Sequence, residues 1–249
     1  MADKPSDPDD KFTFHIPSEK KPDQAMIDKA ESDLLARQRE CYAELEKVQW
    51  QLAYFYSHTG RPQLALGYVE RLVSITEEPE KKALLYLTMG QLMEQSDDCE
   101  AAILFYTQAF SLEPTHSDVW YLINNNLGFC LNTQRDFGAA EAYCLAAIKI
   151  DPARHNAHKN LGLSLAGQGR YAEAVRSLIT AVKRNASDPR ALVHLEELTA
   201  QHPEVFQAIE DLPEQIRKCR EAVKLATLAR ESVEQESQDD ESCTGATVQ

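Results

Sequence analysis

The 249-residue chain has 43% apolar residues and can bury a hydrophobic core, while 9 glycines and 8% aromatic residues argue against an all-β protein. Its formal net charge of −14 disfavours nucleic acid or an anionic membrane as the main partner. No apolar targeting segment follows Met1 and no run of 18 apolar residues occurs, so we expect a cytoplasmic protein without a membrane span. The six cysteines form no CxxC pair or metal-type cluster, and neither a metal nor another cofactor is expected.

The N-terminal part of the chain divides into a polar tail and a helix. Residues 1–23 are rich in Asp, Lys and Pro and are predicted to be disordered. Within them, the segment Phe12–Pro17 alternates apolar and polar residues and is a candidate for docking on the folded part, the alternative being a solvated tail. Residues 24–58 contain neither Gly nor Pro, and their apolar residues recur every three or four positions. This spacing predicts one long amphipathic helix.

Beyond this helix the chain repeats itself. Three segments of 34 residues align without gaps, at 83–116, 121–154 and 155–188, and a fourth at 46–79 follows the same frame less closely. Position 8 of each segment is small, and position 20 is always alanine; these small side chains let the two helices of a hairpin approach closely. The position-8 residues are Ala53, Gly90, Gly128 and Gly162, and the position-20 residues are Ala65, Ala102, Ala140 and Ala174.

The C-terminal part continues this pattern only weakly. A degenerate fifth unit spans 189–212, with Ala208 in the alanine column. A helix over 214–231 is predicted to cap the array, because the last repeat of such an array needs its apolar side covered. The acidic tail over 232–249 is predicted to be disordered.

The central unit resembles the tetratricopeptide repeat family. The residues that carry the resemblance are Leu127, Gly128, Leu131, Phe137, Ala140, Ala147 and Pro152. The resemblance extends over 46–212 and implies an all-α fold, a tetratricopeptide-type α-α superhelix. This solenoid of helical hairpins would carry the long N-terminal helix and the C-terminal capping helix, forming one helical repeat domain over 24–231. Two insertions between units, 80–82 and 117–120, are expected to lengthen helices by about one turn.

The resemblance also implies a site. In this family the first helices of the units line a concave groove that binds an extended peptide segment. Carried over to this chain, the predicted groove residues are Trp50, Gln51, Tyr54, Thr88, Gln91, Asn125, Asn126, Phe129, Lys159, Asn160, Leu163 and His194. Asn126 and Asn160 share position 6 and would bond the ligand backbone, the alternative being that they are simply solvated. Replacing both by alanine is expected to weaken binding and barely affect folding, since Ala is the better helix former.

The run Asn124–Asn126 is predicted to be the start of a first helix rather than a loop, because Leu127, Gly128 and Leu131 continue its packing face. Asn124 should face the preceding helices, while Asn125 and Asn126 reach the groove.

Two other kinds of site are disfavoured. A clamp for a terminal carboxylate needs cations that this chain largely lacks at the corresponding positions, Leu122, Asn126, Asn160, Arg190 and His194. The apolar groove residues favour a peptide with hydrophobic side chains instead. The sequence contains no Gly-rich phosphate loop, GxSxG or HExxH motif, and no catalytic residues are predicted.

The sequence therefore predicts a non-enzymatic adaptor or chaperone-like module with a protein or peptide partner. The alternative is a structural subunit that assembles as a homo-oligomer through the 24–58 helix, similar to the tetratricopeptide chaperones of secretion systems.

Overall fold

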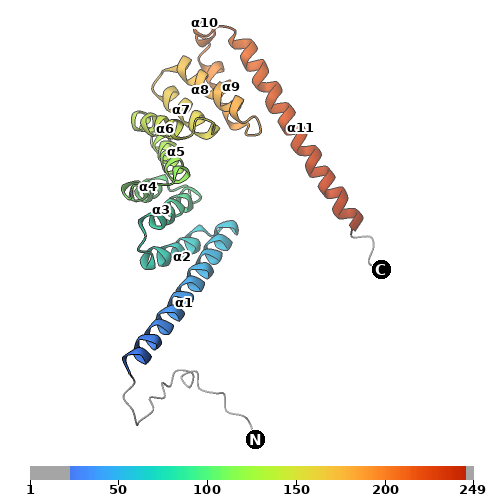
Figure 1. Cartoon of the computed structure of the whole chain (residues 1–249). Coiled ribbons are helices and arrows are strands. Elements are labelled where there is room, and N and C mark those ends of the chain that lie inside the picture. Colours follow the sequence, from blue (N-terminus) through green and yellow to red (C-terminus); the bar gives the residue numbers. More distant parts are fainter. Residues whose placement is uncertain (1–22, 245–249) are drawn as a thin grey trace. The chain divides into compact units, whose positions relative to one another are not determined.

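The computed structural model describes residues 23–244, with side chains described as far as residue 233 (Figure 1). All regular secondary structure in this range is helical. The helices are α1 (Gln24–His58), α2 (Pro62–Ile75), α3 (Pro79–Glu94), α4 (Cys99–Ser111), α5 (Ser117–Thr133), α6 (Phe137–Ile150), α7 (His155–Gly167), α8 (Tyr171–Arg184), α9 (Arg190–Gln201), α10 (Val205–Ala208) and α11 (Leu212–Thr244). The bounds of α1 confirm the long N-terminal helix. The segment Phe12–Pro17 lies outside the described residues.

The chain divides into two compact units, Met1–Val48 and Gln49–Gln249. In the larger unit, each helix from α2 to α9 packs against the next one along the chain. The first helices of successive hairpins also pack against one another, α3 on α5, α5 on α7 and α7 on α9. These first helices therefore form one layer, with the second helices packed against it. This is the α-α superhelix that the repeats predict.

The small residues lie where the helices of a hairpin cross. A Cβ atom at Gly90 would lie 2.3 Å from the ring of Tyr106, and one at Gly128 would lie 2.5 Å from Cys144 Sγ. The position-20 alanines of the first four units have no exposed surface; they are Ala65, Ala102, Ala140 and Ala174. Ala208 differs because it ends the four-residue helix α10 and is exposed.

The turn inside each hairpin places position 15 in the left-handed region. Gly60 and Gly169 have φ angles of 71° and 78°, as expected for glycines that end a helix. Asp97 and Arg135 occupy the same position in the second and third units, with φ angles of 58° and 64°. Asp98 then caps α4, its carboxylate accepting a hydrogen bond from the backbone N–H of Ala101 at 2.9 Å.

The two insertions lengthen first helices, as predicted. Helix α3 has 16 residues and α5 has 17, whereas α7 has 13. The insertion in α3 also supplies Glu80, whose carboxylate accepts hydrogen bonds from the backbone N–H groups of Thr115 at 2.7 Å and His116 at 3.1 Å. These bonds lower the pKa of Glu80. They tie the start of α3 to the start of α5.

Helix α11 packs on α8 and α9 and covers the last hairpin. Ile216, Cys219 and Val223 are its buried apolar residues beyond the first turn. The helix continues to Thr244, which corrects the predicted helix end at 231 and the disordered tail over 232–244. This stretch contains neither Gly nor Pro and is rich in Glu and Gln, so nothing in it stops a helix that is already packed at its start.

Candidate functional site

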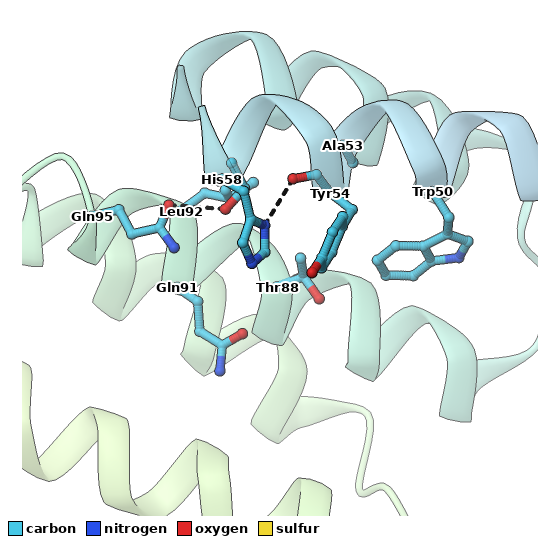
Figure 2. Close-up of a pocket in the computed structure, with 9 residues that line it drawn as sticks. Trp50, Ala53, Tyr54, His58, Thr88, Gln91, Leu92 and Gln95 are labelled. Carbon is cyan, nitrogen blue, oxygen red and sulfur yellow. Dashed lines mark hydrogen bonds between the residues drawn. The ribbon is translucent and has the colours of Figure 1, made fainter. Parts of the chain in front are cut away.

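A pocket of about 250 Å³ lies between the C-terminal end of α1 and α3 (Figure 2). Trp50 and Tyr54 line it from α1, and Thr88 and Gln91 line it from α3. Four of the predicted groove residues therefore lie together. The other lining residues are Ala53, Ser57, His58, Leu92 and Gln95.

Contacts between neighbouring side chains hold this pocket in shape. The ring centroids of Tyr54 and His58 lie 3.9 Å apart. His58 Nδ1 lies 2.9 Å from the carbonyl oxygen of Tyr54; since a carbonyl only accepts, Nδ1 carries the hydrogen, and in the neutral tautomer Nε2 is the acceptor. Ser57 Oγ donates to Gln95 Oε1 at 3.0 Å and links α1 to α3. Tyr54 is 66% exposed, so its ring is available to a ligand at the rim.

Sequence reasoning missed Ser57, His58 and Gln95. They occupy positions 12 and 13 of the first two units, one helical turn beyond Tyr54 and Gln91. The repeat frame places these positions on the groove side, so the signal was present in the sequence.

The asparagine run Asn124–Asn126 lies in the middle of α5, which confirms that it is helical but corrects its predicted place at the helix start, because α5 already begins at Ser117. The exposed fractions of the three residues are only 3%, 8% and 9%. Asn124 Nδ2 donates to the backbone carbonyl of Trp120 at 2.8 Å. Asn160 is buried as well, at 2% exposed. Asn125, Asn126 and Asn160 are therefore held inside the array, and not on the groove surface where the sequence analysis placed them, whereas Asn124 was not expected to reach the groove.

The buried amides form a chain of hydrogen bonds through three units. Asn160 Nδ2 donates to Asn125 Oδ1 at 3.1 Å, and Asn125 Nδ2 donates to Asn126 Oδ1 at 2.9 Å. Asn126 Nδ2 donates to the Tyr106 hydroxyl at 3.2 Å, which donates to Glu94 Oε1 at 2.5 Å. Every donor in the chain points toward the carboxylate, an order in which successive bonds polarise one another.

A second link joins the third and fourth units. Asn132 Nδ2 donates to the backbone carbonyl of Asn160 at 2.9 Å, and Ser164 Oγ donates to Asn132 Oδ1 at 2.8 Å. Asn160 Oδ1 is buried without a hydrogen-bond partner among the described residues. The spacing of first helices α5 and α7 is therefore fixed by polar as well as apolar contacts.

The carboxylate of Glu94, at the end of this chain of hydrogen bonds, lies in a low-dielectric environment. Burial raises the pKa of Glu94, and the hydrogen bonds from Tyr106 and Cys130 oppose this shift. The pKa of Tyr106 is raised by burial and by the Glu94 charge. Tyr106 therefore stays neutral, and its hydroxyl donates a hydrogen bond to Glu94 Oε1.

The remaining predicted residues are spread along the first helices. Gln51 and Phe129 are exposed, while Leu163 and His194 are partly buried. Lys159 is only 7% exposed, and its pKa is lowered by burial and by the nearby charge of Arg190. These residues form no single pocket with Trp50 and Tyr54.

Neither a metal site nor a membrane-spanning helix is found among the described residues. No group of three or more His, Cys, Asp and Glu side chains is placed to hold a metal ion. No helix in this part of the chain has both the length and the apolar character needed to cross a membrane.

Comparison with known proteins identifies the class. Residues 121–154 and 159–195 each match a model of the tetratricopeptide repeat. The chain therefore contains tetratricopeptide repeats, the repeating units of an all-α scaffold for protein–protein interaction. The family resemblance and the fold predicted from the sequence are confirmed.

Relatives and solved structures extend this result. The BBSome complex member BBS4 homolog of Drosophila melanogaster is 26% identical over 139 residues, covering 56% of this chain and 27% of that protein. The chain thus spans about a quarter of the length of this curated relative. Two structures of MamA, "MamA RS-1 ArsTM double mutant" and "MamA 41-end from Desulfovibrio magneticus RS-1", have TM-scores of 0.57 and 0.54. Both are 17% identical and cover 76% of this chain, which covers 97% and 96% of theirs. These two similarities concern the fold.

Proposed function

We propose that the chain is a non-enzymatic adaptor or chaperone-like module that binds an extended peptide segment along the layer of first helices. The pocket in which Trp50 and Tyr54 oppose Thr88 and Gln91 carries this proposal. Aromatic rings bury apolar side chains well, and the polar groups around them can bond the adjacent peptide backbone. The ligand is therefore a peptide that inserts one apolar side chain between α1 and α3.

The size and polarity of the pocket support this kind of ligand. Its volume of about 250 Å³ lies below the roughly 300–1,000 Å³ of pockets that hold drug-sized molecules. It suits one side chain of a longer ligand. His58 Nε2 can accept a hydrogen bond from a peptide N–H, and the amide of Gln91 can both donate and accept.

The scaffold around the pocket is ordered before any ligand binds. Ser57 bonds Gln95 across α1 and α3, and the buried amide chain links α3 and α4 to α5 and α7. A preorganised site leaves most of the ordering cost to the ligand, which favours binding by a flexible peptide. A relative that is named as a member of a multiprotein complex is consistent with an adaptor role.

The proposal is tested with a library of extended peptides, each carrying one Trp, Phe or Leu among polar residues. We expect enriched peptides to bind the full-length chain and to lose about tenfold or more in affinity with Tyr54→Ala, a change of about 1.4 kcal/mol. Leu104→Ala is the control, because Leu104 is 63% exposed on α4 and does not line the pocket. Peptides ending in a free carboxylate or an amide should bind equally. If no peptide is enriched, or if Tyr54→Ala binds as the wild type does, the groove proposal is wrong.

A further inference from the structure

The part of α1 that belongs to the smaller unit, residues 24–48, presents an apolar face to solvent. Every side chain from Gln24 to Leu45 is exposed. Its large apolar residues are 39–64% exposed; they are Met26, Ile27, Leu34, Leu35, Tyr42, Leu45 and Val48. An isolated helix gains little stability in water, and helices in proteins are stabilised mainly by packing of an apolar face. The helix over residues 24–48 therefore requires a partner that buries this apolar face.

The spacing of the face identifies the kind of partner. One column repeats every seven residues and contains Ile27, Leu34, Cys41 and Val48. A second column, four residues further along, contains Glu31, Gln38 and Leu45. A seven-residue repeat keeps a narrow seam turned toward another helix in a left-handed pair. Leu35 and Tyr42 border the seam and widen its apolar surface.

The charges along the seam discriminate between the two ways of pairing identical helices. A parallel pair in register would place Glu31 opposite Glu31 and Gln38 opposite Gln38. Like charges inside a seam repel, and two facing polar residues weaken it. An antiparallel pair avoids both arrangements when residue 31 of one copy lies opposite residue 48 of the other. In this register the two residue numbers in each opposing pair sum to 79.

In this antiparallel register, Leu34 of one copy lies opposite Leu45 of the other, and Glu31 lies opposite Val48. Gln38 meets Cys41 in the two central layers, where a polar residue fixes the register at a cost in stability. On the flanks, Arg37 of each copy lies beside Glu44 of the other, and Leu35 lies beside Tyr42. Opposite charges and apolar side chains are thus matched on the flanks and at Leu34–Leu45.

We propose that two copies of the chain pair through residues 31–48 of α1 as antiparallel helices, so that the protein is a homodimer. This inference goes beyond the groove, since Trp50 and Tyr54 take no part in it. A dimer would present two repeat arrays, and two linked sites bind a divalent partner more tightly than one.

The first experiment measures the mass of the full chain by light scattering over a dilution series. We expect a mass of twice 28.0 kDa. Leu34→Glu combined with Leu45→Glu should give a monomer, because both substitutions place charge in the seam. Leu104→Glu is the matched control, an exposed leucine on α4, and should remain dimeric. Circular dichroism should show that all variants keep a folded array. The proposal is overturned if the wild-type chain is monomeric at every dilution, which is the result expected if another segment or protein covers this face. It is also overturned if the double variant stays dimeric.

The second experiment tests the orientation with oxidised glutathione, which is reduced to thiols as two protein thiols form a disulfide. Gln38→Cys should cross-link through Cys41 of the second copy, and adding Cys41→Ser should remove most of that cross-link. Wild type shows the background from the native cysteines. If Gln38→Cys with Cys41→Ser cross-links as efficiently as Gln38→Cys alone, the helices are parallel and the antiparallel pairing is wrong. Tyr54→Ala should leave mass and cross-linking unchanged, which separates this result from that of the groove test.

Discussion

Asn126→Ala should destabilise the array more than Asn160→Ala, although both residues are buried asparagines at position 6 of a first helix. Asn126 Oδ1 accepts the hydrogen bond from Asn125 Nδ2. Alanine at 126 removes this acceptor and leaves the Asn125 donor buried at 8% exposure. An unsatisfied buried donor costs about 1–3 kcal/mol, and the higher helix propensity of alanine returns at most about 0.7 kcal/mol. The net loss is about 1–2 kcal/mol.

Alanine at position 160 should change the free energy of unfolding less, because it leaves the number of unpaired buried acceptors unchanged. It removes the donor that reaches Asn125 Oδ1, which leaves that oxygen without this partner. It also removes Asn160 Oδ1, which is already buried without a partner. One unpaired acceptor replaces another, and the free energy of unfolding should fall by only about 0.5 kcal/mol from lost packing. A loss of this size at Asn126 would correct the expectation that alanine at both positions barely affects folding.

Thermal unfolding followed by circular dichroism measures the difference. For an array of this size, 1 kcal/mol corresponds to about 2–4 °C in Tm. We expect Asn126→Ala to lower Tm by about 2–8 °C and Asn160→Ala by no more than about 2 °C. Asn156→Ala, on the half-buried part of α7, is the control and should lie near the wild type. An Asn160 variant as unstable as the Asn126 variant would refute the directional chain of hydrogen bonds.

Two further predictions concern the same repeats. Gly128→Ala should lower the free energy of unfolding by about 1–3 kcal/mol, because the new Cβ would lie 2.5 Å from Cys144 Sγ. Gly67→Ala in α2 meets nothing within 4 Å and should raise the free energy of unfolding by about 0.5–1 kcal/mol. Urea denaturation compares the two variants, and equal effects would mean that the helix crossing is misplaced. Burial raises the pKa of Glu94 above its usual 4.5, so its contribution to stability is fully present below pH 4.5 and is lost as the pH rises through the raised value. The Tm of Glu94→Gln minus that of the wild type should therefore increase from pH 4.5 to 7, and a decrease over this range would contradict a desolvated carboxylate.

The sequence by itself determined the repeat architecture. Residues such as Gly128 and Ala140 must be small, because two helix backbones cross there, and this requirement recurs every 34 residues wherever the hairpin recurs. The long helix over 24–58 followed from periodicity and from the absence of Gly and Pro. The family resemblance, carried over in the same repeat frame, predicted that Trp50, Tyr54, Thr88 and Gln91 share the groove side.

Only the tertiary structure decided how those side chains are used. Asn126 and Asn160 share a column in the sequence, but whether an amide meets solvent or a neighbouring amide depends on how closely α5 approaches α7. Asp97 and Arg135 adopt the left-handed turn that glycine adopts elsewhere, because the hairpin imposes that backbone on whatever residue is present. The helix beyond residue 231 continues because the start of α11 packs on α8 and α9. The composition of residues 232–244 does not reveal this packing.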